Sequence, residues 1–344
     1  MEFHLIKLGT RPLLAVPCGL PKMWQVAIDC YPAHTWKKRL VRVILGGVAR
    51  VGLLGKLFPA RELSLPGVGK LDFESWLGSL GEELNVSELH PVLVWPADPA
   101  RGRVYIYLLN NRGEKLGFCK LGLDAKNNEL IERERRALEL LGSMKLKLSR
   151  IPKLLAHGCL VGEIEGGAYL VVEITPTNAR NIDWQCDASI EANIAEYAGS
   201  NRTIERAEVE SLGWWTEVKR VFAGNVVFIK ELEEACQQGI EVCLAHGDLN
   251  CTNVLRGVDE IWLLDWEQSD QNAPVLTDQV CVAVDKLWLA NPDDAAGNLQ
   301  KFSDIFKYDN DPKKRAQVIM ALAYLGASGF PPALAMIDAR YPNA

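Results

Sequence analysis

Two short segments in the second half of the chain hold the residue types that phosphoryl transfer requires. The first reads His246-Gly-Asp-Leu-Asn-Cys-Thr-Asn253, and the second reads Leu263-Leu-Asp-Trp-Glu267. Asp248 can accept the proton of an attacking hydroxyl group, while Asn253 and Asp265 offer the hard oxygen ligands that Mg²⁺ on a nucleotide prefers. The alternative is a loop whose Asp and Asn side chains only cap turns. The combined spacing favours the phosphoryl-transfer interpretation.

The same spacing resembles the kinase-like small-molecule phosphotransferases of the aminoglycoside phosphotransferase and choline kinase superfamily. In that family the catalytic loop reads H-G-D-x-x-x-x-N, and a metal-binding segment reads I-D-W-E or I-D-F-E; residues 264–267 read L-D-W-E here. The resemblance covers residues 91–290. It implies that Asp248 is the catalytic base. His246, which we place in the same catalytic group, would support the loop by hydrogen bonding rather than transfer a proton.

The resemblance also assigns the metal-binding residues. Asn253 and Asp265 would hold the Mg²⁺ ions, and Glu267 would contribute around the second ion. Asp278 would brace the catalytic loop from the start of the following helix, although an Asp at such a position is also a common helix N-cap. The cofactors implied are therefore ATP or GTP together with Mg²⁺.

A buried ion pair between Lys120 and Glu134 is predicted from a helical pattern. Residues 129–141 place apolar side chains on one stripe, and Glu134 falls on that stripe with them. A carboxylate on the buried face of a helix needs a partner, and Lys120, on a preceding predicted strand, is the obvious one. In the family that the chain resembles, this Lys orients the α and β phosphates of the nucleotide. The apolar stripe consists of Leu130, Ile131, Ala137, Leu138 and Leu141.

Short apolar runs with period-two character predict the strands of a small lobe. The last run leads into a segment that resembles the nucleotide hinge, where backbone groups of Glu173 and Ile174 would contact the base. The loop from residue 98 to 103 would lie over the nucleotide, or it is an ordinary hairpin loop. The predicted strands cover residues 92–95, 104–109, 116–121, 151–156 and 169–173.

The pattern and the resemblance together predict an α+β, bilobal, protein-kinase-like fold. Residues 1–90 would form an N-terminal basic amphipathic extension. Residues 91–176 would form a nucleotide-binding small lobe with an antiparallel sheet and one helix. Residues 177–344 would form the catalytic and substrate-binding large lobe, which is mainly helical.

The segment from residue 177 to 245 carries a strong excess of acidic side chains. It contains twelve Asp and Glu residues but six Lys and Arg residues. In the resembled family this region helps to form the acceptor site, and an acidic wall would suit a cationic acceptor such as an amino sugar or choline. Charges on solvated helix faces are the alternative, and the one that we favour.

Residues 1–90 lie outside the resemblance. Between Asp29 and Glu62 the chain has no acidic residue, whereas it has seven basic ones interleaved with large apolar side chains. A basic amphipathic segment of this kind can lie on an anionic membrane surface, here through residues 36–58. A helix packed on the small lobe is the alternative, and the one that we favour. The basic residues are Lys37, Lys38, Arg39, Arg42, Arg50, Lys56 and Arg61.

Composition excludes several other classes of protein. The formal net charge is −6, which argues against a nucleic-acid partner. Nine cysteines occur without a C-x-x-C pair, a pattern typical of reduced thiols in a cytoplasmic protein. The N-terminus lacks the features of a signal peptide. We therefore expect a cytoplasmic protein, with peripheral membrane association as the variant that the basic segment suggests.

The sequence thus predicts an enzyme that moves the γ-phosphoryl group of ATP or GTP to a hydroxyl group. The acceptor would be a small molecule such as an amino sugar, a sugar or a choline-like alcohol. A nucleotide-binding pseudokinase or scaffold is the alternative, and the resemblance would connect it with surface-polysaccharide synthesis. Retention of every expected phosphoryl-transfer group argues for the enzyme.

Overall fold

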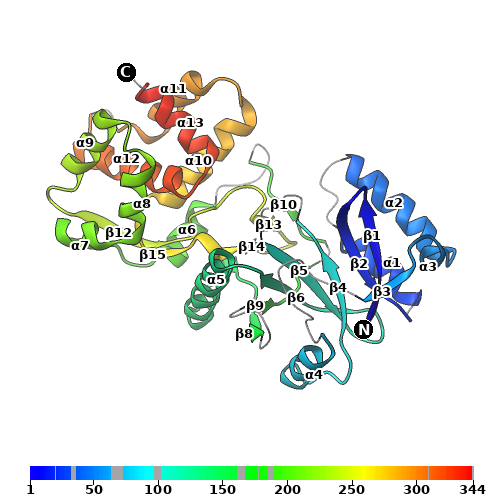
Figure 1. The fold of residues 1–344 in the computed structure, drawn as a ribbon. Helices are drawn as coiled ribbons and strands as arrows, with labels where there is room; N and C mark the ends of the chain where they lie inside the picture. The colour runs from blue at the N-terminus through cyan, green and yellow to red at the C-terminus, as the bar shows by residue number, and fades with distance from the viewer. Residues whose placement is uncertain are drawn as a thin grey trace. The chain divides into compact units, whose positions relative to one another are not determined.

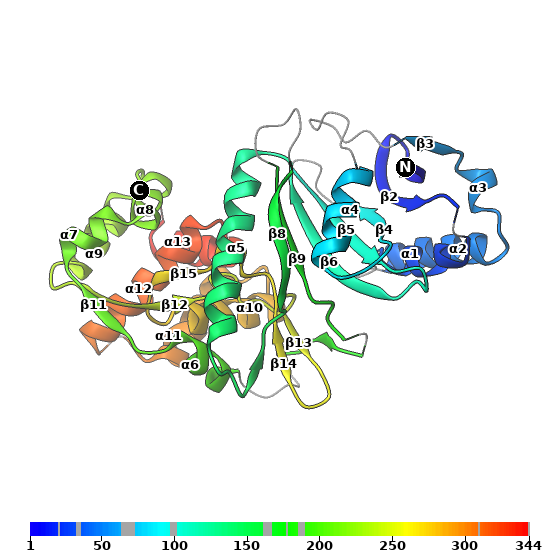
Figure 2. The ribbon, with the colours of Figure 1, turned by 90° about the horizontal axis from the view of Figure 1, so that it is seen from below.

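The computed structural model describes residues 1–19, 21–31, 36–62, 73–96, 102–160, 167–176, 178–184, 190–308 and 310–342. The chain divides into two compact units (Figures 1 and 2). The first comprises Met1–Arg135 and Pro152–Ile174, and the second comprises Arg136–Ile151 and Thr175–Ala344. The long helix α5 (Ala125–Ser143) begins in the first unit and ends in the second.

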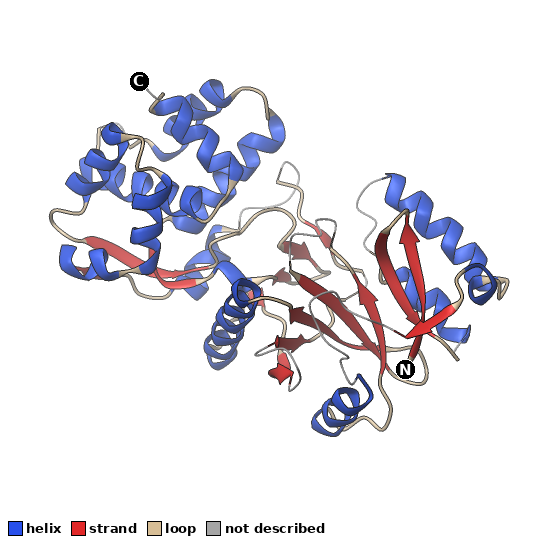
Figure 3. Ribbon diagram, in the orientation of Figure 1, coloured by secondary structure: helices blue, strands red, loops and turns tan. Residues whose placement is uncertain are grey.

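The first unit is built on a single antiparallel sheet of eight strands, shown in red in Figure 3. Its order is β3-β1-β2-β4-β5-β6-β9-β8. The five strands predicted from the apolar runs are all present and neighbour one another in this sheet. The strands are β1 (Glu2–Leu8), β2 (Arg11–Pro17), β3 (Ala60–Glu62), β4 (His90–Val94), β5 (Arg103–Leu109), β6 (Lys115–Gly122), β8 (Leu154–Leu160) and β9 (Gly167–Val172).

Both faces of this sheet are covered, because its strands are apolar on both sides. In β4, Val92 and Val94 face one core while Leu93 faces the other, as the two-residue period of a strand requires. The helix α4 (Phe73–Glu83) covers one face through Leu77 and Leu80. The opposite face carries α1 (Trp24–Asp29), α2 (Trp36–Arg50) and α3 (Leu54–Leu57).

The first ninety residues are part of this unit. Strand β2 joins them to the predicted strands, since Leu14 pairs with Val94 and Ala15 pairs with Leu93. The run from Leu13 to Val16 is buried throughout, so it shows no alternation that would mark it as a strand. The sheet therefore extends by three strands beyond the five that were expected.

The second unit is mainly helical, with two small sheets. The helix α12 (Pro312–Ala327) is its central element, because α8 (Gly213–Val221), α10 (Thr277–Ala290) and α13 (Pro331–Arg340) all pack against it. Its residues from Val318 to Gly326 are all buried, as expected for a helix surrounded by others. The remaining helices are α6 (Glu191–Ala198), α7 (Arg206–Ser211), α9 (Val226–Ala235) and α11 (Ala295–Phe306).

The two small sheets of the second unit hold the segments of chemical interest. One has the order β11-β12-β15, and the other has the order β10-β13-β14-β7. The strands are β7 (Ser149–Arg150), β10 (Arg180–Asn181), β11 (Arg202–Ile204), β12 (Ile240–Ala245), β13 (Val254–Arg256), β14 (Ile261–Leu263) and β15 (Asp270–Pro274). The α+β class, with an antiparallel sheet in one unit and a mainly helical second unit, is confirmed. Within the described residues, no helix combines the length and apolarity needed to cross a bilayer.

Candidate active site

The loop from His246 to Asn253 connects β12 to β13 in the second unit. The hairpin of β13 and β14 pairs Val254 with Leu263, and the Leu264 N–H donates to the Asn253 carbonyl at 2.9 Å. This hydrogen bond places Leu264 opposite Asn253, so Asp265, the next residue, begins its turn beside Asn253. The nine residues between the two sequence motifs are thus the length of one short hairpin.

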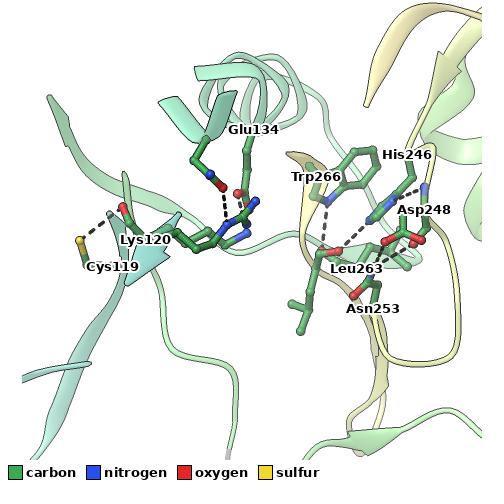
Figure 4. A network of polar contacts seen from close by, with 11 residues as sticks. Cys119, Lys120, Glu134, His246, Asp248, Asn253, Leu263 and Trp266 are labelled. Atoms are coloured by element: carbon green, nitrogen blue, oxygen red, sulfur yellow. Dashed lines mark hydrogen bonds and ion pairs between the residues drawn. The ribbon is translucent and has the colours of Figure 1, made fainter. Parts of the chain in front are cut away.

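Asp248 lies at the centre of a network of amide groups (Figure 4). Its carboxylate accepts hydrogen bonds from Asn250 Nδ2 at 2.8 Å and from Asn253 Nδ2 at 3.0 Å. The same Asn253 Nδ2 donates to the Asp248 carbonyl at 2.8 Å. Since Asn253 uses its nitrogen for both contacts, its amide oxygen is the atom that remains suited to a cation.

The Asp248 carboxyl group has a strongly perturbed pKa. The pKa is raised to about 6, mainly by burial, with a smaller contribution in the same direction from the negative charge of Asp265, while the hydrogen bond from Asn250 lowers it. A carboxylate with a pKa near neutrality is well matched to general-base catalysis.

Asp265 occupies an unusual backbone conformation at the end of β14. Its φ of 65° lies in the left-handed region, which costs a residue other than glycine about 1 kcal/mol or more. The following short helix, η3 (Trp266–Gln268), fixes this turn through the completely buried Trp266. One carboxylate oxygen of Asp265 lies within 4.8 Å of one from Glu267. Such a strained turn presents both carboxylates from one short segment.

His246 is completely buried and has a contact at each ring nitrogen. Its Nε2 lies 2.7 Å from the Leu264 carbonyl, and its Nδ1 accepts from the Asp248 N–H at 3.3 Å. A carbonyl can only accept and an N–H can only donate, so the ring is the neutral tautomer protonated at Nε2. The ring also packs on Trp266 at 4.5 Å between centroids. This arrangement suits a residue that supports the loop rather than one that moves a proton.

Asp278 holds the beginning of the loop from the first turn of α10. Its carboxylate accepts from the backbone N–H groups of His246 at 2.7 Å and Gly247 at 3.0 Å, and from the Tyr197 hydroxyl at 2.7 Å. Gly247 has a φ of 79°, and a Cβ there would lie 2.3 Å from the Gln268 carbonyl oxygen. Both the carboxylate and the missing side chain are therefore needed for this turn.

A second carboxylate on α10, Asp285, holds the far half of the same loop, and the sequence analysis missed it. Its Oδ2 accepts from the Cys251 N–H at 2.8 Å and from Trp184 Nε1 at 2.6 Å. Asp285 is buried and lies two helical turns after Asp278. A sequence signal existed, because Asp285 shares its helix face with buried apolar residues, as Glu134 does.

The first unit contributes the Lys120–Glu134 ion pair predicted from the helix pattern. Lys120 Nζ lies 2.6 Å from Glu134 Oε2, and both side chains are more than nine-tenths buried. Strand β6 positions the Lys between Tyr105 and Leu170 on its neighbouring strands. A buried pair of this kind is weak evidence for stability, and it is typical of a group held in place for function.

The remaining predicted nucleotide contacts also belong to the first unit. Glu173 follows β9, where its N–H donates to the Lys153 carbonyl at 2.9 Å and its carboxylate accepts from the Lys153 N–H at 3.3 Å. Ile174 comes next and ends the unit. Of the loop from 98 to 103, residues 97–101 lie outside the described part of the chain. Gly102 has a φ of 45° and sits against the Asp124 carboxylate.

The acidic segment from 177 to 245 is largely compensated by neighbouring basic residues. Among the described residues of this segment, at least seven acidic side chains form ion pairs, and Glu196 accepts from the backbone N–H groups of residues 147–149. This geometry supports charged helix faces rather than an acidic wall for a cation. The pairs are Arg202–Glu208, Arg206–Glu210, Lys219–Glu233, Arg220–Glu217, Lys230–Glu234, Lys313–Glu241 and Arg315–Glu231.

Comparisons with known proteins find similarity among solved structures alone. Neither a protein-family model nor a curated protein matches the sequence. A thermostable mutant of the aminoglycoside phosphotransferase APH(4)-Ia, in a ternary complex with ADP and hygromycin B, is 15% identical with a TM-score of 0.42, covering 78% of this chain and 99% of that one. An amicoumacin kinase in complex with AMP-PNP and Ca²⁺ is 13% identical with a TM-score of 0.40, covering 75% and 85%. A glucosamine kinase is 11% identical with a TM-score of 0.29, covering 74% and 82%. At these identities and TM-scores, no activity follows from the likeness.

Proposed function

We propose that this protein is a Mg²⁺-dependent phosphotransferase that moves the γ-phosphoryl group of ATP or GTP to a hydroxyl group of a small molecule. The observation that carries the proposal is the arrangement around Asp248. A carboxylate with a pKa of about 6, the Asn253 amide and the Asp265 carboxylate are held together by one loop and one hairpin. This is the set of groups that phosphoryl transfer to an alcohol requires.

The donor set fits a hard divalent cation. The Asn253 amide oxygen, the Asp265 carboxylate and the Glu267 carboxylate are all oxygen ligands of the kind that Mg²⁺ prefers. The charge repulsion between Asp248 and Asp265 is also unfavourable in the protein alone, and a cation would relieve it. When bound, Mg²⁺ would neutralise the charge of the phosphate oxygens. Asn253, Asp265 and Glu267 would hold it.

Asp248 then acts as the base for the acceptor. Its carboxylate is fixed by Asn250 and Asn253, so it is oriented before the acceptor arrives. In the transfer step the acceptor hydroxyl gives its proton to Asp248 while its oxygen forms the new bond to the γ phosphorus. The bond from the γ phosphorus to the bridging oxygen breaks, and its electron pair stays on that bridging oxygen, which leaves with the nucleoside diphosphate. His246 supports the loop through both ring nitrogens and takes no part in this proton transfer.

Within the first unit, the proposal assigns Lys120 to the α and β phosphates of the nucleotide. An ammonium group on a strand is flexible unless it is held, and Glu134 holds it at 2.6 Å. The backbone groups of Glu173 and Ile174 would contact the base. Hydrogen bonds from backbone groups serve either adenine or guanine, so the proposal includes both ATP and GTP.

The acceptor is proposed to be a small molecule with a hydroxyl group, such as an amino sugar, a sugar or a choline-like alcohol. Because the acidic helices of the second unit are compensated by ion pairs, a neutral sugar is accommodated as readily as a cation. We also propose that the protein acts in a reducing compartment such as the cytoplasm. The eight described cysteines are all free thiols, and burial raises the pKa of seven of them.

Nucleotide turnover tests the proposal. The protein should transfer phosphate from labelled ATP or GTP to water or to an acceptor panel in the presence of Mg²⁺, and EDTA should abolish this. Asp248→Asn should lower kcat by at least about 10³-fold, because the base is lost and the geometry is kept. Asp259→Asn, an exposed carboxylate in the same hairpin, is the matched control and should leave kcat unchanged. Equal slow rates in all three proteins would instead indicate a nucleotide-binding scaffold.

A further inference from the structure

The helix α2 carries large apolar side chains on a side that faces solvent. A helix on a globular protein normally buries its large apolar residues and exposes small or polar ones. Here the buried residues of α2 are Gly46 and Ala49. Several of its large apolar side chains face solvent, with Trp36 at 69% and Val43 at 70% exposure. We call this exposed set the α2 face; it consists of Trp36, Leu40, Val43, Ile44 and Val51.

The inner side of α2 is already occupied by the first unit. Gly46 lies against the Gln25 side chain of α1, where an added Cβ would be 3.1 Å from Gln25 Nε2. Val41, Leu45 and Val48 pack on the apolar core beneath the sheet. The helix is therefore fixed in this orientation by close packing on α1. Its outer side carries further large apolar side chains that make no contact with the described core of the unit.

The α2 face forms one continuous stripe. Trp36, Leu40 and Ile44 recur at intervals of four residues and Val43 lies three residues after Leu40; Val51, the residue that follows α2, lies two turns after Ile44. Such spacing places them on a single side of the helix. Leu53 and Leu57, at the end of α2 and in α3, are also exposed. A contiguous exposed apolar surface of this kind marks an interaction site.

Basic residues flank this stripe, and no acidic residue occurs between Asp29 and Glu62. At 3.6 residues per turn, Lys37 falls on one side of the stripe, and Arg39 and Arg50 fall on the other. Three positive charges therefore flank the apolar stripe directly, in a segment that carries seven basic residues and no acidic one, although the formal net charge of the chain is −6. The complementary surface has to be apolar at its centre and anionic over a wide area.

We propose that the α2 face binds the surface of an anionic membrane, with the helix lying in the plane of the interface. The apolar side chains would enter the boundary between headgroups and acyl chains, with Trp36 at headgroup depth. The Lys and Arg residues would contact anionic headgroups. A second copy of this chain fits less well, because a two-fold contact would place the same basic residues of both copies against each other. The site is independent of the proposed phosphotransferase activity.

Sedimentation of the full chain with lipid vesicles tests the proposal. One set of vesicles contains phosphatidylcholine alone, and in the other about one third of the lipid is phosphatidylglycerol. The protein should sediment with the anionic vesicles, at least about tenfold less with the neutral ones, and less as NaCl is increased. Leu40→Ser with Ile44→Ser should lower the partition coefficient about tenfold or more.

Matched variants separate the α2 face from general surface hydrophobicity. Val226→Ser with Val227→Ser removes two equally exposed apolar residues from the second unit, so vesicle binding should be unchanged. Lys37→Glu with Arg50→Glu should lose the preference for anionic lipid. Unchanged thermal unfolding of each variant confirms that it folds. Brominated lipid should quench the fluorescence of the wild-type protein more than that of Trp36→Phe.

Two outcomes would overturn the proposal. The first is the absence of sedimentation with anionic vesicles, or binding that Leu40→Ser with Ile44→Ser leaves intact. The second is a concentration-dependent dimer that the same double substitution dissociates, which would assign the α2 face to a second copy of the chain. Loss of phosphotransferase activity in any variant does not bear on this result, since vesicle binding is measured without nucleotide.

Discussion

The strongest test of the site's electrostatics is to replace Asp248 by Asn and to measure how the resulting change in stability varies with pH. Burial raises the pKa of Asp248 from 3.8 to about 6, so the folded protein holds this proton more tightly than the unfolded chain does. The stability that the group contributes is therefore fully present below its ordinary pKa and is lost as the pH rises through 6. At neutral pH the ionised carboxylate costs the fold about 3 kcal/mol.

Asp248→Asn removes this cost because the amide does not ionise. With the two pKa values above, the linkage relation gives the variant a gain over wild type that grows by about 1.4 kcal/mol between pH 5 and pH 7.5. For a unit of this size, the Tm of the variant minus that of wild type should rise by roughly 3–6 °C over this pH range. A constant offset from the new amide, whose Nδ2 faces the donors of Asn250 and Asn253, cancels in the comparison.

The assay is thermal unfolding of both proteins at several pH values, without nucleotide or metal. Asp259→Asn, which removes an exposed carboxylate from the same hairpin, should show a Tm difference that does not change with pH. If the Tm of Asp248→Asn minus that of wild type stays constant or falls as the pH rises, the reasoning is refuted. It would mean that the carboxylate is solvated, and that Asp248 is an unsuitable base near neutral pH.

Three further predictions follow from the packing of the site. Gly247→Ala should destabilise the protein by about 2–4 kcal/mol in urea unfolding, because its φ is positive and the new Cβ meets a carbonyl oxygen at 2.3 Å. The control is Gly329→Ala at the end of α12, where φ is also positive but the space is open, and it should cost about 1 kcal/mol. Glu134→Leu should cost about 3–5 kcal/mol by removing the carboxylate that holds the buried Lys120 ammonium, and adding Lys120→Met should restore most of this stability. Asp285→Asn should speed hydrogen exchange in the loop from 246 to 253 with a smaller change in global Tm, and an unchanged exchange rate at the Cys251 amide would contradict its bracing role.

Much of the site was predictable because its chemistry is written in short segments. Asp248 and Asn253 lie on one loop, and the length between the motifs is that of a single hairpin, so their proximity needs no long-range contact. The pair of Lys120 and Glu134 was predictable for a different reason. A buried carboxylate on a helix demands a partner, and few residues were suitable.

The contribution of the N-terminal residues could not be predicted in the same way. The pairing of β2 with β4 joins segments about eighty residues apart, and nothing in either strand specifies its partner. The orientation of α2 was equally hidden, because its apolar residues fit a helix buried through that stripe as well as one exposed through it. Small residues at Gly46 and Ala49 decide the matter, since they allow the close approach to α1.

Asp278 and Asp285 show what the sequence analysis could still have gained from its own argument. Both are acidic residues on the buried side of α10. Asp278 accepts from the backbone N–H groups of His246 and Gly247, and Asp285 accepts from that of Cys251. A loop that must present Asp248 in one orientation leaves its own N–H groups without partners within the loop, and a carboxylate on a rigid helix satisfies one or two of them. Asp278 and Asp285 lie two turns apart on α10, and they bind the beginning and the second half of the loop, respectively. Buried carboxylates on apolar helix stripes are therefore the signal in this chain that most directly marks the residues around its proposed chemistry.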